Sequence, residues 1–141
     1  MAVYRDAAHM KAILEGVFER AQQTEVTRGL RQSQMIVAFI YHNPEVTVLM
    51  DGRSPAPEGE PIIVKFDDLT PAPDVSFELA ADVGHQFWKG KLNVPMALAR
   101  GQIKAKGQIT KALKLLPLLP PLYQAYRDVL NERGETDLLD K

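Results

Sequence analysis

The side chains that could do acid–base, nucleophilic or metal chemistry are few and scattered along the sequence. The three histidines, His9, His42 and His85, show neither His-x-His nor His-x-x-x-His spacing, so they do not form the pattern of a zinc site. No serine stands in the context of a nucleophile elbow, and the chain contains no cysteine. The acidic pair Asp67-Asp68 borders a proline-containing break, where a solvated turn explains it. We therefore expect no catalytic residue, no metal and no cofactor, and we predict that the protein is not an enzyme.

A segment that is both cationic and apolar points to a different chemistry. The whole chain is nearly neutral, with 17 basic and 18 acidic side chains, which excludes nucleic-acid binding driven by bulk charge. Between Val83 and Arg127, however, there are 8 basic side chains and no acidic one. The same segment holds the most apolar stretch of the chain, LKLLPLLPPL at residues 113–122. This combination favours contact with an anionic amphiphile, either free or in a membrane surface; the alternative is a set of solvated lysines beside a buried helix pair.

Length and composition place these residues in one globular domain. The chain has 141 residues, of which 45% are hydrophobic and 25% charged, and this excludes a disordered tail or a collagen. We expect a single domain over residues 1–134 and a frayed C-terminal tail over residues 135–141. The first residues lack the basic start and apolar run of a secretory signal, and no apolar stretch approaches the ~18–20 residues of a membrane span, so we expect a cytoplasmic protein.

Hydrophobic periodicity predicts helices and strands in a mixed order. The first helix, capped by Asp6, carries an apolar stripe at helical spacing and ends at about Gly29. Strands are predicted at residues 34–41, 46–51, 62–66, 74–80 and 102–106. Further helices are predicted at residues 83–89, from the cap residue Asn93 to Gly101, at 108–116 and at 121–133. The first strand is apolar on both faces, so we expect a central strand that is covered on two sides.

Residues 74–116 contain a recognisable series of motifs. They are the strand DVSFEL at residues 74–79, FWKGKL at 87–92, NVPMALARG at 93–101 and QIKAKG at 102–107, with glycines at 90, 101 and 107. In these motifs the chain resembles the sterol carrier protein 2 family, and the order of elements agrees over most of residues 6–133. The resemblance implies an α+β fold, a five-stranded, mostly antiparallel sheet covered on one face by about five helices. It also implies an apolar tunnel between sheet and helices for lipids, sterols or fatty acyl chains. The longer segment 115–122, the added C-terminal helix and the bulky Trp88 depart from the smallest members of the family.

On this resemblance we expect a ligand-binding tunnel lined by apolar and aromatic side chains, for which plain core packing is the alternative. The expected lining residues are Ile13, Val17, Phe87, Trp88, Met96, Leu113, Leu116, Leu119, Tyr123 and Tyr126. Lys104 and Lys106 alternate with apolar neighbours and are expected to face solvent. Because Pro117, Pro120 and Pro121 interrupt backbone pairing, residues 109–130 are expected to form a pliable lid.

The predicted function is non-enzymatic binding and transfer of a fatty acid, fatty acyl-CoA, sterol or phospholipid. The expected partners are that lipid or fatty acyl ligand and, transiently, an anionic membrane surface, with no nucleic acid. One alternative is an acyl-CoA thioesterase, which needs a long helix carrying an acid or asparagine after an early strand. Here the strongest helix comes first, and its inward face is apolar. Another alternative is the same fold with a filled core, serving as an accessory or interaction module in isoprenoid-quinone or steroid metabolism.

Overall fold

The protein is built on a five-stranded sheet with the strand order β3-β2-β1-β4-β5. The computed structural model describes residues 2–141. The central strand β1 (Ile36–His42) pairs antiparallel with β2 (Val46–Asp51) and parallel with β4 (Val75–Ala80). At the two edges, β3 (Ile63–Phe66) pairs antiparallel with β2, and β5 (Ile103–Gly107) pairs antiparallel with β4. The predicted mostly antiparallel sheet is therefore confirmed, with β1–β4 as its parallel pair.

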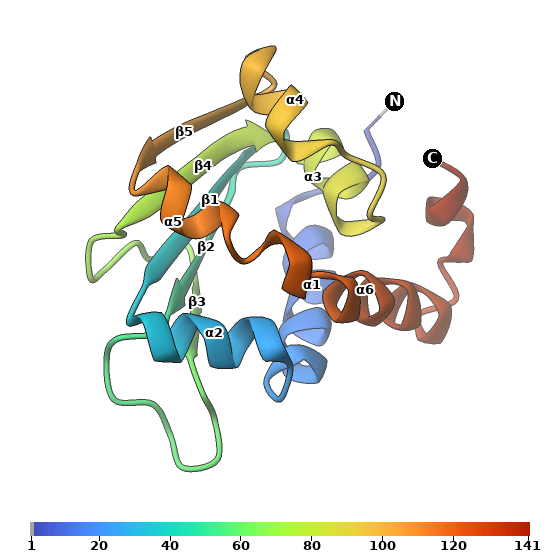
Figure 1. The fold of residues 1–141 in the computed structure, drawn as a ribbon. Coiled ribbons are helices and arrows are strands. Elements are labelled where there is room, and N and C mark those ends of the chain that lie inside the picture. Colours follow the sequence, from blue (N-terminus) through green and yellow to red (C-terminus); the bar gives the residue numbers. More distant parts are fainter. Residues whose placement is uncertain (1) are drawn as a thin grey trace.

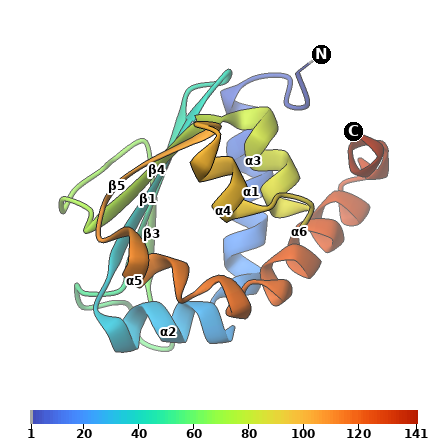
Figure 2. The same cartoon turned by 45° about the horizontal axis from the view of Figure 1, so that its top comes forward.

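The α-helices lie together on one face of the sheet (Figures 1 and 2). They are α1 (Ala7–Ala21), α2 (Glu25–Ser33), α3 (Ala81–Trp88), α4 (Val94–Ala99), α5 (Ile109–Leu113) and α6 (Pro120–Glu132), with the short 3-10 helices η1 (Leu116–Leu118) and η2 (Thr136–Asp140). Strands and helices form one continuous apolar core between the two layers. The predicted α+β fold is confirmed.

The first helix owes its position to one cap and one apolar stripe. The Asp6 side chain accepts a hydrogen bond from the backbone N–H of His9 at 2.8 Å, which satisfies a donor that the first turn leaves unpaired. The stripe that includes Ile13, Leu14 and Val17 is fully buried. On its other side α1 packs against α6, where a Cβ on Gly16 would stand 3.3 Å from the Val129 methyl groups.

The prediction of one long first helix ending near Gly29 is wrong. α1 ends at Ala21, and a separate helix, α2, follows from Glu25 to Ser33. The Thr27 hydroxyl lies 3.2 Å from the carbonyl oxygen of Ala21 and 2.8 Å from that of Gln22, so it donates to the end of the first helix. α2 was missed because few apolar side chains mark its buried side.

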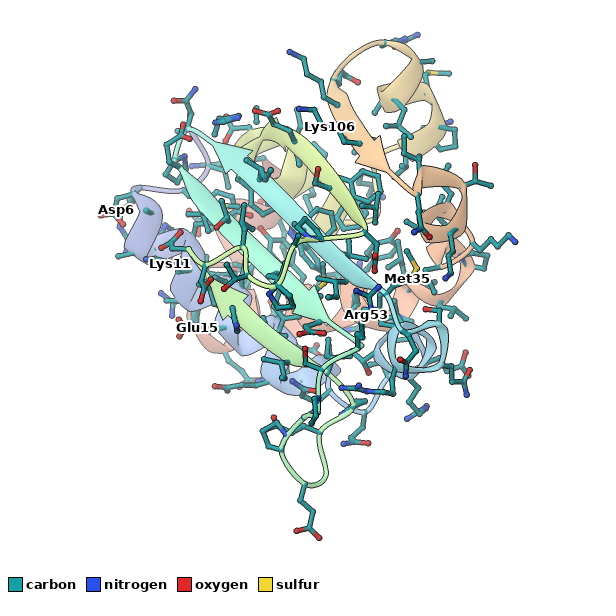
Figure 3. The ribbon with its side chains drawn as sticks, turned by 90° about the vertical axis from the view of Figure 1, so that its left-hand side faces the viewer. Asp6, Lys11, Glu15, Met35, Arg53 and Lys106 are labelled. Atoms are coloured by element: carbon teal, nitrogen blue, oxygen red, sulfur yellow. The ribbon has the colours of Figure 1, made fainter. Side chains whose placement is uncertain are left out.

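The other face of the sheet is covered by a loop. Ile36, Ala38 and Leu49 are fully buried there, and Leu69 packs against them from the segment that joins β3 to β4. Figure 3 shows this segment crossing the strands, with Lys106 at the edge of the same face. β1 is thus covered on both sides, as its two apolar faces predicted.

The expectation of a frayed C-terminal tail is corrected by the structure. Residues 136–140 form η2, and the side chain of Leu138 is buried. The Glu135 carboxylate accepts hydrogen bonds from His9 Nε2 at 2.7 Å and from Arg133 Nε at 2.8 Å. The tail was expected to fray because chain termini are usually poorly ordered, but these contacts dock it on α1 and α6.

A chain of buried hydrogen bonds fixes the same end of the molecule. The Nε2 atom of His85 lies 2.8 Å from the carbonyl oxygen of Leu138, so this nitrogen carries the proton and donates it. In the neutral ring Nδ1 is then an acceptor, and the Tyr126 hydroxyl donates to it at 2.7 Å. The Tyr4 hydroxyl in turn donates to the Tyr126 oxygen at 2.6 Å. One orientation of the three protons satisfies every partner, provided that His85 is neutral.

This arrangement predicts a loss of stability on acidification. Burial lowers the pKa of His85 below its ordinary value; Lys89 and Lys141 act in the same direction, while Asp82 and the Leu138 carbonyl oppose them. The folded state binds a proton on His85 less readily than the unfolded state does. The contribution of neutral His85 to the free energy of unfolding is therefore full above about pH 6.5 and is lost as the pH falls through the lowered pKa. We expect the free energy of unfolding, measured with urea, to be smaller at pH 5 than at pH 7.5. The decline should be shallower in His85→Gln, and an equally steep decline in that variant would contradict the assignment.

Candidate functional site

An apolar cavity lies between the sheet and the helical layer. Its volume is about 80 Å³. The sheet contributes the inward-facing side chains Val37, Phe39, Tyr41, Met50, Phe77, Leu79 and Ile103. The helices and the segments between them contribute Val26, Leu30, Phe87, Trp88, Val94, Ala112, Leu113, Leu115, Leu116, Leu119 and Leu122. No lining side chain carries a charge.

The structure places half of the expected tunnel residues at this cavity. Those that line it are Phe87, Trp88, Leu113, Leu116 and Leu119. Those that do not are Ile13, Val17, Met96, Tyr123 and Tyr126. Ile13 and Val17, on α1, are completely buried in the core and do not reach the cavity.

The remaining three lie elsewhere for identifiable reasons. α4 buries Val94 and Ala97, and this one-turn spacing turns Met96 outward, where it is 46% exposed. Tyr126 is occupied by its hydrogen bonds to Tyr4 and His85. The ring of Tyr123 stands edge-on to Phe87 at 6.1 Å between centroids and lies against Gly90, where a Cβ would be 2.9 Å from Tyr123 Cδ2.

The lining residues that were missed come mainly from α2 and the strands. Val26 and Leu30 belong to the helix that was not predicted. The strand residues, by contrast, carried a readable signal, because the period-2 alternation already puts Val37, Phe39 and Tyr41 on one face. Choosing the helix-facing side of each strand would have found them.

On the sheet and α3 walls of the cavity, the side-chain nitrogen and oxygen atoms are those of Trp88 and Tyr41, which contact one another. The indole Nε1–H of Trp88 donates to the Tyr41 hydroxyl at 3.2 Å, and both side chains are buried. Burial also raises the pKa of Tyr41 well above its ordinary range, so its hydroxyl stays neutral. Trp88 is held in place by edge-to-face rings, Phe18 at 5.8 Å and Phe87 at 5.2 Å between centroids. The lining holds no serine, cysteine, histidine or charged side chain, and its surface is almost entirely hydrocarbon.

α5, η1 and the residues between them form a half-buried part of the cavity wall. Leu113, Leu115 and Leu116 line the cavity there and are only half-buried. A dry apolar cavity of roughly 150 Å³ can hold benzene. A volume of about 80 Å³ is smaller than that, so a long chain does not fit into the cavity in this structure.

The described residues contain neither a metal-binding cluster nor a membrane-spanning helix. Within residues 2–141 no three histidine or acidic side chains are placed to hold a metal ion. In the same part of the chain, no helix combines the length and apolar character needed to cross a membrane.

Solved structures share this fold. Sterol carrier protein 2 from Yarrowia lipolytica (apo form) superposes with a TM-score of 0.60 at 16% identity, covering 83% of this chain and 91% of that one. The sterol carrier protein domain 2 of Helicoverpa armigera superposes with a TM-score of 0.59 at 24% identity, covering 86% of this chain and 90% of that one. No protein-family model and no curated protein matches the sequence. The fold implied by residues 74–116 is confirmed.

The same architecture also occurs inside an enzyme. The stereoselective inverting sec-alkylsulfatase Pisa1 from Pseudomonas sp. matches 70% of this chain with a TM-score of 0.55 at 18% identity, but the match covers 15% of the Pisa1 chain. The fold alone therefore does not decide between a carrier and a part of an enzyme, and the cavity chemistry must be considered.

Proposed function

We propose that this protein binds a hydrophobic ligand in the cavity between sheet and helices and transfers it without chemical conversion. The ligand classes are a fatty acid, a fatty acyl-CoA, a sterol or a phospholipid. The observation that carries the proposal is the lining itself, which is uncharged and is apolar apart from the Trp88–Tyr41 pair. The shared fold of the sterol carrier protein 2 structures supports it.

The energetics of such a site are those of hydrocarbon transfer. Each methylene that leaves water for the cavity contributes about 0.8 kcal/mol, so even a few buried groups give measurable affinity. A charged end of the ligand has to remain outside, because no charged side chain lines the interior. The surrounding segment, residues 83–127, contains basic and no acidic side chains, which favours an anionic end and brief contact with an anionic membrane.

The alternative functions have less support. A thioesterase needs an acid or an amide beside the bound acyl group, and none lines the cavity. The small cavity volume does favour one competitor, a filled-core interaction module that holds no ligand.

Ligand binding should be visible without an added label on the protein. Trp88 is the one tryptophan of the chain and lines the cavity, so its fluorescence reports directly on occupancy. We expect delipidated protein to bind a fluorescent fatty acid with saturable energy transfer from Trp88. Native mass spectrometry of freshly purified protein should show a co-purified lipid. Protein that is free of lipid and fails to bind the probe would favour the filled-core module instead.

A further inference from the structure

Leu113, Leu115 and Leu116 of the cavity wall belong to a segment with few attachments to the rest of the fold. We call this segment, residues 109–119, the strap. Its backbone hydrogen bonds stay local, such as those from Leu115 N–H to the Ala112 carbonyl and from Leu118 N–H to the Leu115 carbonyl. At its C-terminal end the Leu119 carbonyl accepts from Leu122 and Tyr123 of the adjoining α6. Among the described residues, the one other hydrogen bond that joins the strap to the sheet or to another helix runs from Lys111 Nζ to the Ser33 carbonyl at 3.4 Å. The remaining contacts between the strap and the rest of the fold are apolar. The strap can therefore move away from the cavity without breaking hydrogen bonds between strands.

The strap rests on a position of α2 that has no side chain. A Cβ on Gly29 would stand 3.2 Å from Leu115 Cδ2 and 3.3 Å from Leu118 Cδ1. The two leucines therefore lie directly against the α2 backbone. Leu115 also lines the cavity, so the same contact that seats the strap closes the wall.

The outer surface of the strap is cationic and partly apolar. Lys111, Lys114 and Pro117 are exposed, and the leucines between them are half-buried. The strap contains no acidic residue, and neither does any part of residues 83–127. An anionic lipid surface complements this pattern, because it attracts the two ammonium groups and also offers the leucines an apolar medium.

We propose that the strap is a gate which an anionic bilayer opens. In the closed state Leu115 and Leu118 sit on Gly29, and the cavity is too small for a long chain. At the bilayer the lysines engage lipid phosphates, the half-buried leucines turn toward the lipid, and the cavity opens where its ligand is supplied. The inference rests on the proposed lipid-binding function and adds the partner and the moving part.

The first test compares two kinds of vesicle. A fluorescent fatty acid is transferred to the protein from vesicles of phosphatidylcholine alone or of phosphatidylcholine with phosphatidylglycerol. We expect several-fold faster transfer from the anionic vesicles, and loss of that advantage in the double variant Lys111→Gln, Lys114→Gln. The matched control is Lys104→Gln, Lys106→Gln, which removes the same charge from exposed lysines of β5. These two alternate with the cavity-lining Ile103 and so lie on the sheet face away from the strap, and the variant should keep the advantage.

The second test weakens the contact between the strap and α2 by a substitution at Gly29. Gly29→Ala pushes against Leu115 and Leu118, so we expect faster uptake of the probe from solution and a smaller response to anionic vesicles. Gly16→Ala is the matched control, because its Cβ meets Val129 at a similar distance of 3.3 Å, away from the cavity lining. Both substitutions favour helix formation to the same extent.

The outcomes separate the gate from the binding function. If the wild type binds the probe but its uptake is indifferent to vesicle charge, the strap lysines and Gly29→Ala, the gate is overturned and the carrier function stands. If neither the wild type nor Gly29→Ala binds the probe at all, the carrier function and the gate are both overturned.

Discussion

Replacing Ala112 with phenylalanine is expected to lower the affinity for a fluorescent fatty acid about tenfold or more. Ala112 is a small, buried residue of the cavity lining, so the added ring occupies the space that the ligand would take. Excluding only two methylene groups, at about 0.8 kcal/mol each, already accounts for a factor of about ten. The measurement is a titration of delipidated protein, with urea unfolding to establish that the variant is folded.

Met96→Phe is the control for this experiment. Met96 is exposed on α4 and does not line the cavity, so the same aromatic ring placed there should leave the affinity unchanged. Equal affinity of wild type, Ala112→Phe and Met96→Phe, with all three folded, would show that the ligand binds elsewhere.

Truncating Trp88 to alanine is expected to cost about 3–5 kcal/mol of the free energy of unfolding. Trp88 is only 1% exposed, and its ring stacks on Tyr126 at 6.1 Å between centroids while its indole N–H donates to Tyr41. The variant loses packing on both sides and leaves the buried Tyr41 hydroxyl without this donor. A domain with the usual stability of about 5–15 kcal/mol would lose a large part of it. Urea unfolding followed by circular dichroism measures the change.

Trp88→Phe is the comparison that separates packing from hydrogen bonding. Phenylalanine keeps most of the buried surface but cannot donate to Tyr41, so its cost should be well below that of alanine. A cost for alanine under 1 kcal/mol would mean that the aromatic cluster repacks freely, which contradicts the close packing described here.

Local patterns predicted the fold well where they were strong. The alternation of residues 75–79 and the two apolar faces of residues 36–41 gave strands close to those observed, because a buried face imposes a period of two. α2 was not predicted, because Val26 and Leu30 are the only apolar residues on its buried side and the rest of the segment is largely polar. Its position depends on tertiary contacts with the strap and the sheet, which no local pattern records.

The candidate site was harder to predict than the fold. Whether an apolar side chain faces a cavity or another side chain depends on the separation of two layers, and periodicity does not contain that distance. Ile13 and Leu113 look alike in the sequence, yet the first is completely buried in the core and the second lines the cavity. The docked tail was missed for a similar reason, since the carbonyl of Leu138 is held by a histidine 53 residues earlier in the chain.

The pairing of α1 with α6 bears on how this chain emerges during synthesis. Arg20 and Glu132 form an ion pair across that contact although 112 positions separate them. The first helix emerges from the ribosome before the sheet that covers its apolar stripe, and α6, which packs on its other side, is translated only after the entire sheet. Until then the nascent chain exposes apolar surface of the kind that chaperones recognise. Ribosome-bound chains that stop before residue 120 should therefore be held by chaperones longer than chains in which residue 132 has left the exit tunnel.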